Sequence, residues 1–170
     1  VYTPQEIVDF MCAAVEETLL NEFGLRLGDP GVNILDPCVG TGNFMVNLIN
    51  RVELRDLDRV YTEQLFANEV MLLPYYVASL NIEMAYWERY GREPGRYQAF
   101  EGLSFVDTLD LVERADGQMK MDFITEKNAE RVETQKKTEI NVIIGNPPYN
   151  VGQVNENDNN KNRTYGEIDD

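Results

Sequence analysis

A short apolar stretch near the end of the chain, residues 141–144, stops abruptly at a glycine and two prolines. The sequence from Asn141 to Asn150 is Asn-Val-Ile-Ile-Gly-Asn-Pro-Pro-Tyr-Asn. The apolar residues predict a buried strand. Because Pro147 and Pro148 have no N–H to donate and a fixed φ, this strand must end before them. The segment beyond it is therefore stiff and carries amide, carbonyl and aromatic groups.

These groups suit a planar base that carries an amino group. The side-chain oxygen of Asn146 and the carbonyl of Pro147 can both accept from an amino group, and the ring of Tyr149 can stack on the base. The simpler interpretation is a strand that ends in a rigid turn. Four residues do not decide between the two, so the decision depends on the segments upstream.

A glycine-rich turn follows another predicted strand, residues 32–35. From Asp36 to Phe44 the sequence is Asp-Pro-Cys-Val-Gly-Thr-Gly-Asn-Phe, and a helical pattern continues to Val52. A strand, a glycine turn and a helix in this order bring backbone amides close to a nucleotide at the carboxyl end of a sheet in α/β folds. The turn is therefore a candidate nucleotide site.

Gly40 and Gly42 allow the sharp bend and let a ligand approach the backbone. A dinucleotide-binding fingerprint would have a third glycine where Met45 stands. A nicotinamide-dependent oxidoreductase is therefore a remote alternative.

Two more predicted strands end at acidic residues. Residues 65–69 end at Glu69, which is well placed to accept from ribose hydroxyls. The alternative is a solvated glutamate that opens the next helix, residues 72–90. Residues 100–106 form the third strand, and Asp107 after it can receive the amino group of a bound adenine.

The chain opens with a helix start signal. Thr3 can cap the helix, Pro4 suits its first position, Glu6 completes a capping box, and Gly24 is a stop signal. Helical spacing predicts the buried face of this helix and of the helix at 72–90. The predicted faces are Ile7, Met11, Ala14, Val15, Thr18 and Leu19 in the first helix, and Leu73, Val77, Leu80, Met84 and Trp87 in the second.

The remaining segments are polar. Within the long connection 108–140, residues 127–139 carry dense mixed charge and are predicted to form an exposed helix or a mobile insertion. We predict one domain, residues 1–150, followed by a polar loop or disordered tail, residues 151–170. Alternating strands and helices predict an α/β fold with a doubly wound, mainly parallel sheet, so all four candidate sites should meet at one edge of it.

Composition limits the partners. The net charge of −15 argues against a nucleic-acid clamp, which needs clustered Lys and Arg. If the substrate is DNA, a basic surface outside this segment must hold it. The chain has no histidine and two cysteines without metal-ligand spacing, so no metal site is predicted, and Cys12 and Cys38 are interpreted as packing residues. No apolar run approaches the ~20 residues that span a bilayer.

Three motifs together resemble a known family. Thr-Pro-Gln-Glu-Ile-Val at the start, the glycine turn and Asn-Pro-Pro-Tyr look like the ordered motifs of gamma-class adenine (amino-group) DNA methyltransferases. Asn-Glu-Asn-Asp-Asn-Asn-Lys-Asn-Arg in the tail resembles the methylase region of single-chain (type I-like, ISP) restriction–modification enzymes. The resemblance implies a Rossmann-like methyltransferase domain truncated after its fourth strand. It also implies S-adenosylmethionine as cofactor, DNA as partner, flanking nuclease, helicase and target-recognition domains, and a prokaryotic cytoplasmic location.

The resemblance assigns roles to individual residues. Thr3 would contact the methionine end of the cofactor, Glu69 the ribose and Asp107 the adenine amino group. Family members often have an aromatic residue after this last acid, but Thr108 and Leu109 stand here, which leaves the adenine pocket wall undefined. The implied cofactor-binding set is Thr3, Asp36, Pro37, Gly40, Gly42, Phe44, Glu69 and Asp107, and the implied catalytic set is Asn146, Pro147, Pro148 and Tyr149.

Two alternatives to DNA methylation remain open at this point. Release-factor methyltransferases also use Asn-Pro-Pro-Tyr, and the same acceptors suit the side-chain amide of a protein glutamine. The segment can also be a cofactor-binding piece of a larger machine that is inactive in isolation.

Overall fold

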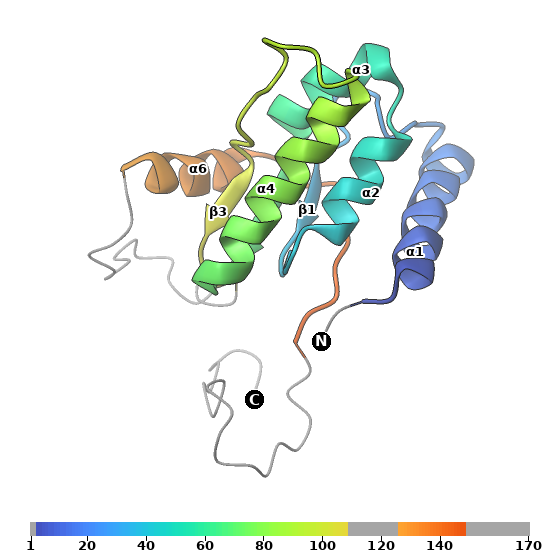
Figure 1. Ribbon diagram of the computed structural model, residues 1–170. Helices are drawn as coiled ribbons and strands as arrows, with labels where there is room; N and C mark the ends of the chain where they lie inside the picture. Colours follow the sequence, from blue (N-terminus) through green and yellow to red (C-terminus); the bar gives the residue numbers. More distant parts are fainter. Residues whose placement is uncertain (1–2, 109–125, 149–170) are drawn as a thin grey trace, which may run out of the picture.

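The computed structural model describes residues 3–108 and 126–148, which form one parallel sheet flanked by helices (Figure 1). Adjacent strands follow the order β3-β2-β1-β4, and every pair is parallel. This architecture confirms the predicted α/β class. The strands are β1 (Ile34–Asp36), β2 (Leu65–Glu69), β3 (Leu103–Phe105) and β4 (Val142–Ile143).

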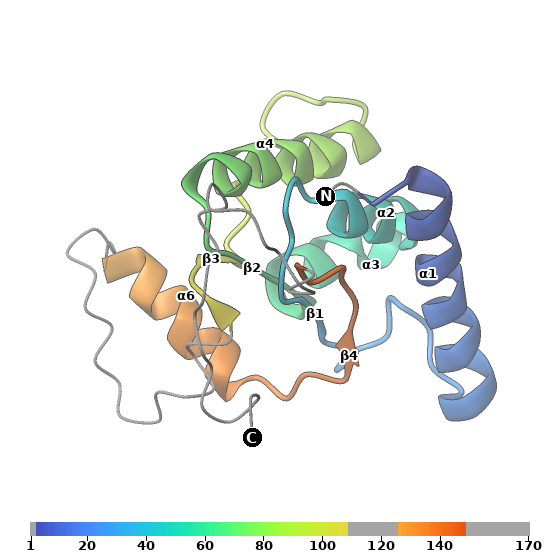
Figure 2. The ribbon, with the colours of Figure 1, turned by 90° about the horizontal axis from the view of Figure 1, so that it is seen from below.

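Helices cover the two faces of the sheet unequally. Figures 1 and 2 show α2 and α4 side by side on one face, with α1 beyond α2, and α6 on the opposite face beside β3. The helices are α1 (Gln5–Thr18), α2 (Asn43–Arg51), α3 (Leu54–Arg59), α4 (Leu72–Arg89) and α6 (Glu126–Lys137), and π-helical turns extend α1 and α3 as η1 (Leu19–Phe23) and η2 (Val60–Gln64).

The sequence predicts the positions of the strands better than it predicts their lengths. The bounds predicted for β2 are confirmed, whereas β1 lies slightly later than residues 32–35. The third strand is shorter than residues 100–106, because Phe100 turns away to pack on Tyr61, with ring centroids 5.1 Å apart. The fourth strand is likewise shorter than predicted, and it forms an edge of the described sheet.

The predicted buried faces of two helices are only partly correct: Leu19 is buried and Met11 and Val15 pack against the core, but other predicted residues are exposed. In α1, Val8 and Cys12 are fully buried while Ile7 is exposed. In α4, Ala78 and Ile82 are buried, and the larger Leu73 and Leu80, predicted to be buried, are 74% and 60% exposed. The small side chains of α4 let that helix approach the glycine turn closely, so the tertiary contact selects a face that side-chain size does not predict.

The charged segment 127–139 contains α6, so the exposed-helix alternative is correct. The side-chain amide of Asn128 attaches this helix to the edge strand β3. It accepts from the backbone N–H of Phe105 (2.7 Å) and donates to the same residue's carbonyl (3.1 Å). This pair of bonds satisfies backbone groups that an edge strand otherwise leaves open.

Three predictions lie outside the described residues: Leu109, Tyr149 and the tail 151–170. Within the described ranges, no helix is both long and apolar enough to cross a membrane.

Candidate active site

Three acidic side chains from the ends of neighbouring strands lie around the glycine turn. Asp36 ends β1, Glu69 ends β2, and Asp107 follows β3. Burial raises the pKa of the Cys38 thiol to about 11, and the charges of these three carboxylates add to the increase. Gly40 in the turn donates its backbone N–H to Glu69, and Thr108, three residues beyond β3, donates to the carbonyl of Pro37, so the ends of β1, β2 and β3 meet at the turn.

Glu69 connects the turn to the start of α4. One of its carboxylate oxygens accepts from the backbone N–H of Gly40 (3.0 Å), and the other accepts from that of Met71 (2.8 Å). Each oxygen can accept further bonds, since a carboxylate offers about four lone-pair sites. Glu69 is 9% exposed, so it is a buried strand-end acid, and the alternative of a solvated glutamate is wrong.

Asp36 is fully buried, and only one of its two carboxylate oxygens is hydrogen-bonded within the described residues. Its Oδ1 accepts from the backbone N–H of Cys38 (3.0 Å), while its Oδ2 has no hydrogen-bond partner in the described part of the chain. Burial raises the pKa of this carboxyl most, the bond from Cys38 lowers it and the charge of Glu69 raises it, so that the pKa is about 7. An unpaired buried carboxylate oxygen is the kind of group that a cationic ligand satisfies.

The Asn-Pro-Pro segment reaches this cluster through Gly145. A Cβ at Gly145 would lie 2.6 Å from Oδ1 of Asp36 and 3.2 Å from Cδ of Pro37. Only a glycine permits such an approach, and it brings the next residue, Asn146, to the glycine turn. Pro147 and Pro148 are exposed just beyond.

Asn146 and the turn share a small hollow of about 50 Å³. Gly40 and the buried side chain of Phe44, both in the predicted cofactor-binding set, contribute to its wall. Gly42 does not line the hollow and instead faces α4. Its φ is 92°, and a Cβ there would lie 3.2 Å from Cγ1 of Ile82. The lining residues are Thr3, Cys38, Val39, Gly40, Thr41, Asn43, Phe44 and Asn146.

Thr3 does not cap α1, contrary to the prediction. Pro4 occupies the N-cap, and its carbonyl accepts from the N–H groups of Ile7 and Val8. The Thr3 hydroxyl instead accepts from Nδ2 of Asn146 at 3.0 Å. The extended backbone of Pro4 shifts the helix start by one residue and leaves the threonine side chain to face the hollow.

Sequence reasoning missed two polar residues beside the site. Nδ2 of Asn68 donates to the Thr108 hydroxyl (3.0 Å), which donates to the carbonyl of Pro37 (2.7 Å). Oδ1 of Asn68 is buried without a partner among the described residues. The only sequence signal was an amide inside the apolar strand β2 and a threonine where the family often has an aromatic residue. Together they tie β2 and the segment that follows β3 to the glycine turn.

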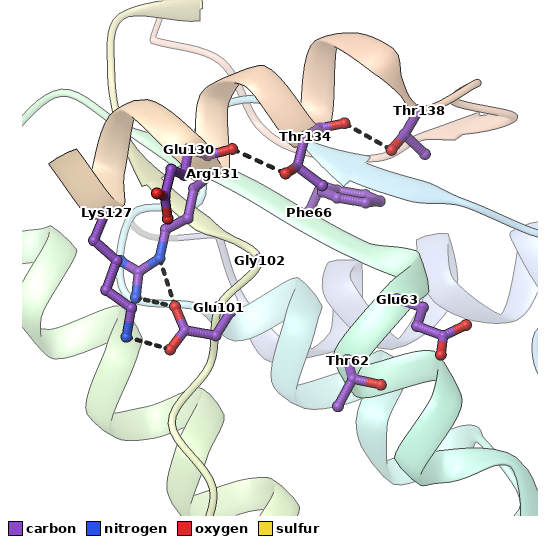
Figure 3. A pocket seen from close by; sticks show the side chains of 10 residues that line it. All are labelled: Thr62, Glu63, Phe66, Glu101, Gly102, Lys127, Glu130, Arg131, Thr134 and Thr138. Atoms are coloured by element: carbon purple, nitrogen blue, oxygen red, sulfur yellow. Dashed lines mark hydrogen bonds and ion pairs between the residues drawn. The ribbon is translucent and has the colours of Figure 1, made fainter.

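A larger cavity of about 490 Å³ lies elsewhere, between α6 and the segments that precede β2 and β3 (Figure 3). Glu101 forms ion pairs there with Lys127 (2.5 Å) and Arg131 (2.6 Å). The charges of Glu101, Lys127 and Arg131 are thus paired with one another, and none of the predicted site residues lines this cavity, so we do not assign it the reaction. The lining is Thr62, Glu63, Phe66, Glu101, Gly102, Lys127, Glu130, Arg131, Thr134 and Thr138.

Within residues 3–108 and 126–148, no group of three or more acidic or cysteine side chains is placed to hold a metal ion.

A parallel sheet of order β3-β2-β1-β4, with a glycine turn after β1 and acids at the strand ends, defines a Rossmann-like α/β protein of the methyltransferase type. Residues 1–97 match the family described as N-6 DNA Methylase, and the chain belongs to this family. A comparison with curated proteins finds no match.

Solved structures of restriction–modification enzymes match almost the whole chain. A cryoEM structure of a DrdV–DNA complex is 47% identical with a TM-score of 0.86 and 99% of this chain covered. The ATP-dependent type ISP enzyme LlaBIII bound to DNA is 38% identical, with a TM-score of 0.86 and 99% of this chain covered. A nuclease-deletion mutant of the type ISP enzyme LlaGI, in complex with a DNA substrate mimic, is 41% identical, with a TM-score of 0.87 and 98% of this chain covered. This chain spans 16%, 12% and 14% of those chains respectively, so it corresponds to part of their methylase region.

Proposed function

We propose that this chain is part of the catalytic domain of an enzyme that methylates the exocyclic amino group of adenine in DNA, within a restriction–modification system. The observation that carries the proposal is the position of Asn146. Its amide borders the same hollow as the glycine turn, so a methyl donor on the turn and an amino group on the amide would meet there. Membership of the N-6 DNA Methylase family supports the same reaction.

The polar groups around the turn suit S-adenosylmethionine. The cofactor supplies an electrophilic methyl group bound to a sulfonium. The carboxylates of Asp36, Glu69 and Asp107 favour a cation. Oδ2 of Asp36 and Oδ1 of Asn68, which have no hydrogen-bond partner among the described residues, offer buried acceptors. We assign the methionine end to Thr3 and to the turn from Asp36 to Gly42. Glu69 would hold the ribose and Asp107 the adenine.

The catalytic task of the chain is to make a weak nucleophile reactive. The lone pair of an adenine amino group is delocalised into the ring. Acceptance of its two hydrogens by Oδ1 of Asn146 and the carbonyl of Pro147 localises that lone pair as positive charge develops on the nitrogen. The attack then needs no strong base, in keeping with a chain without histidine. Tyr149 would stack on the extruded base.

The net negative charge of the chain repels the phosphates of DNA, so another part of the protein must bind them. We propose that a basic surface outside this segment binds the phosphates and that target-recognition, nuclease and helicase parts flank it, in the cytoplasm of a prokaryote. The DNA-bound restriction–modification enzymes that the chain resembles support this arrangement.

The test is transfer of a radioactive methyl group from S-adenosylmethionine by the whole protein. We expect labelling of adenine N6 in duplex DNA, little labelling of a glutamine-bearing release factor, and loss of transfer in Asn146→Ala. The exposed Asn50→Ala in α2 is the matched control and should retain activity. Labelling of the release factor alone would overturn the proposal in favour of glutamine methylation. The 170-residue chain alone should bind the cofactor in a calorimeter without methylating DNA.

A further inference from the structure

Thr3 and Asn146 are 143 positions apart in the sequence, yet their side chains are hydrogen-bonded. Nδ2 of Asn146 donates to the Thr3 hydroxyl oxygen at 3.0 Å, a normal length for such a bond. Both residues are half-buried and line the hollow. Pro4 rather than Thr3 occupies the N-cap of α1 and no side chain caps this helix, so the threonine side chain is free to face the site.

This bond engages the NH₂ end of the amide and leaves its oxygen end free for a substrate. A primary amide has one oxygen, which only accepts, and one NH₂, which only donates. An adenine amino group needs an acceptor. If the amide of Asn146 were rotated by 180°, its NH₂ would meet the substrate's NH₂, and neither group could accept. In the observed state Nδ2 donates to the Thr3 hydroxyl, which leaves Oδ1 for the substrate. The hydroxyl could also donate to the oxygen of a rotated amide, so it holds the amide in place while the substrate's NH₂ selects the state in which the oxygen faces it.

We propose that Thr3 is a positioning residue for the reaction, in that its hydroxyl holds the Asn146 amide with the oxygen directed to the target amino group. The inference rests on the proposed function and deepens it, because it gives Thr3 a second role beside contact with the cofactor. A pure cofactor contact would change cofactor affinity, whereas a positioning role changes the turnover number. The two roles can therefore be separated by kinetics.

The first experiment compares Thr3→Val with Thr3→Ser in the whole protein. Valine keeps the shape but loses the acceptor, and serine keeps the hydroxyl. We expect Thr3→Val to lower kcat about tenfold, the size of one lost hydrogen bond, and Thr3→Ser to stay within about threefold of the parent. Melting temperature should be unchanged in both variants. Thr134→Val in α6, an exposed threonine that does not line the hollow, is the matched control.

The second experiment adds Asn146→Asp. A carboxylate presents an acceptor oxygen in either orientation, so it needs no partner to set its direction. In the Asn146→Asp background, Thr3→Val should then cost about twofold or less, far from additive. Equal costs in the two backgrounds overturn the inference, as does an equal loss of kcat in Thr3→Ser and Thr3→Val. If Asn146→Asp is inactive, the comparison of serine with valine decides alone.

Failure of the proposed function would be distinct. A parent protein that transfers no methyl group to DNA overturns that proposal, whereas normal transfer with an unaffected Thr3→Val overturns only the positioning role.

Discussion

Gly145 lies against the carboxylate of Asp36 so closely that any side chain there would collide with it: a Cβ would be 2.6 Å from Oδ1. Gly145 is not among the glycines with positive φ, so the backbone conformation does not demand a glycine. Instead, the close contact between the ends of β4 and β1 demands a glycine at this position. This contact holds the Asn-Pro-Pro segment beside the glycine turn.

Gly145→Ala should therefore destabilise the chain by about 1–3 kcal/mol, as overpacking does in a filled site. Urea unfolding of the 170-residue chain measures this cost. In an Asp36→Ala background part of the collision is removed, so the cost should fall. An unchanged cost in that background would show that the crowding comes from elsewhere.

The two glycines of the turn should respond differently to alanine. Gly40 has a φ of 57° with nothing within 4 Å of a Cβ, whereas Gly42 has a φ of 92° and meets Ile82 at 3.2 Å. We expect about 1 kcal/mol of lost stability for Gly40→Ala and more for Gly42→Ala, because the second adds a steric contact to backbone strain. Equal losses, measured by urea unfolding, would contradict this order.

The buried carboxyl of Asp36 should make stability depend on pH. Its pKa rises from 3.8 to about 7 on folding, so the folded state holds the proton more tightly than the unfolded state. The associated stability is present below pH 3.8 and is lost as pH rises to about 7. Asp36→Asn removes the titration. Its stability relative to the parent should increase between about pH 4 and pH 8 by on the order of 4 kcal/mol, as followed by urea unfolding. A difference that is constant with pH would refute the raised pKa of Asp36.

Asn128→Ala should loosen α6. The substitution leaves the backbone N–H and carbonyl of Phe105 without the bonds they make to the amide, at a cost of about 1–3 kcal/mol. Hydrogen exchange at the Phe105 amide should accelerate, with Glu133→Ala on the exposed face of α6 as control. Unchanged protection of that amide would mean that α6 is held by other contacts.

Asn146→Ala and Tyr149→Ala in the whole protein should each reduce methyl transfer at least about 100-fold, the usual loss for a group that stabilises developing charge. Neither residue is assigned to cofactor binding, so cofactor affinity should stay within about threefold. Calorimetry with S-adenosylmethionine checks the second point. An equal loss of cofactor affinity would contradict the division between the turn and the Asn-Pro-Pro-Tyr segment.

The sequence by itself determined the order of strands and helices and the edge at which the site lies. Parallel strands end on the same side of a sheet, so Asp36, Glu69 and Asn146 had to come together once the alternation of elements was recognised. Local signals were sufficient for this, because apolar runs, glycine turns and proline stops act over a few residues.

Only the tertiary structure decided which groups touch. The buried face of α4 depends on how closely that helix approaches Gly42, and the partner of Thr3 depends on a segment 143 positions away. The links from Asn68 through Thr108 to Pro37 likewise join three separate strand ends. Such contacts depend on distances between remote parts of the chain, and no local pattern of residue types records those distances.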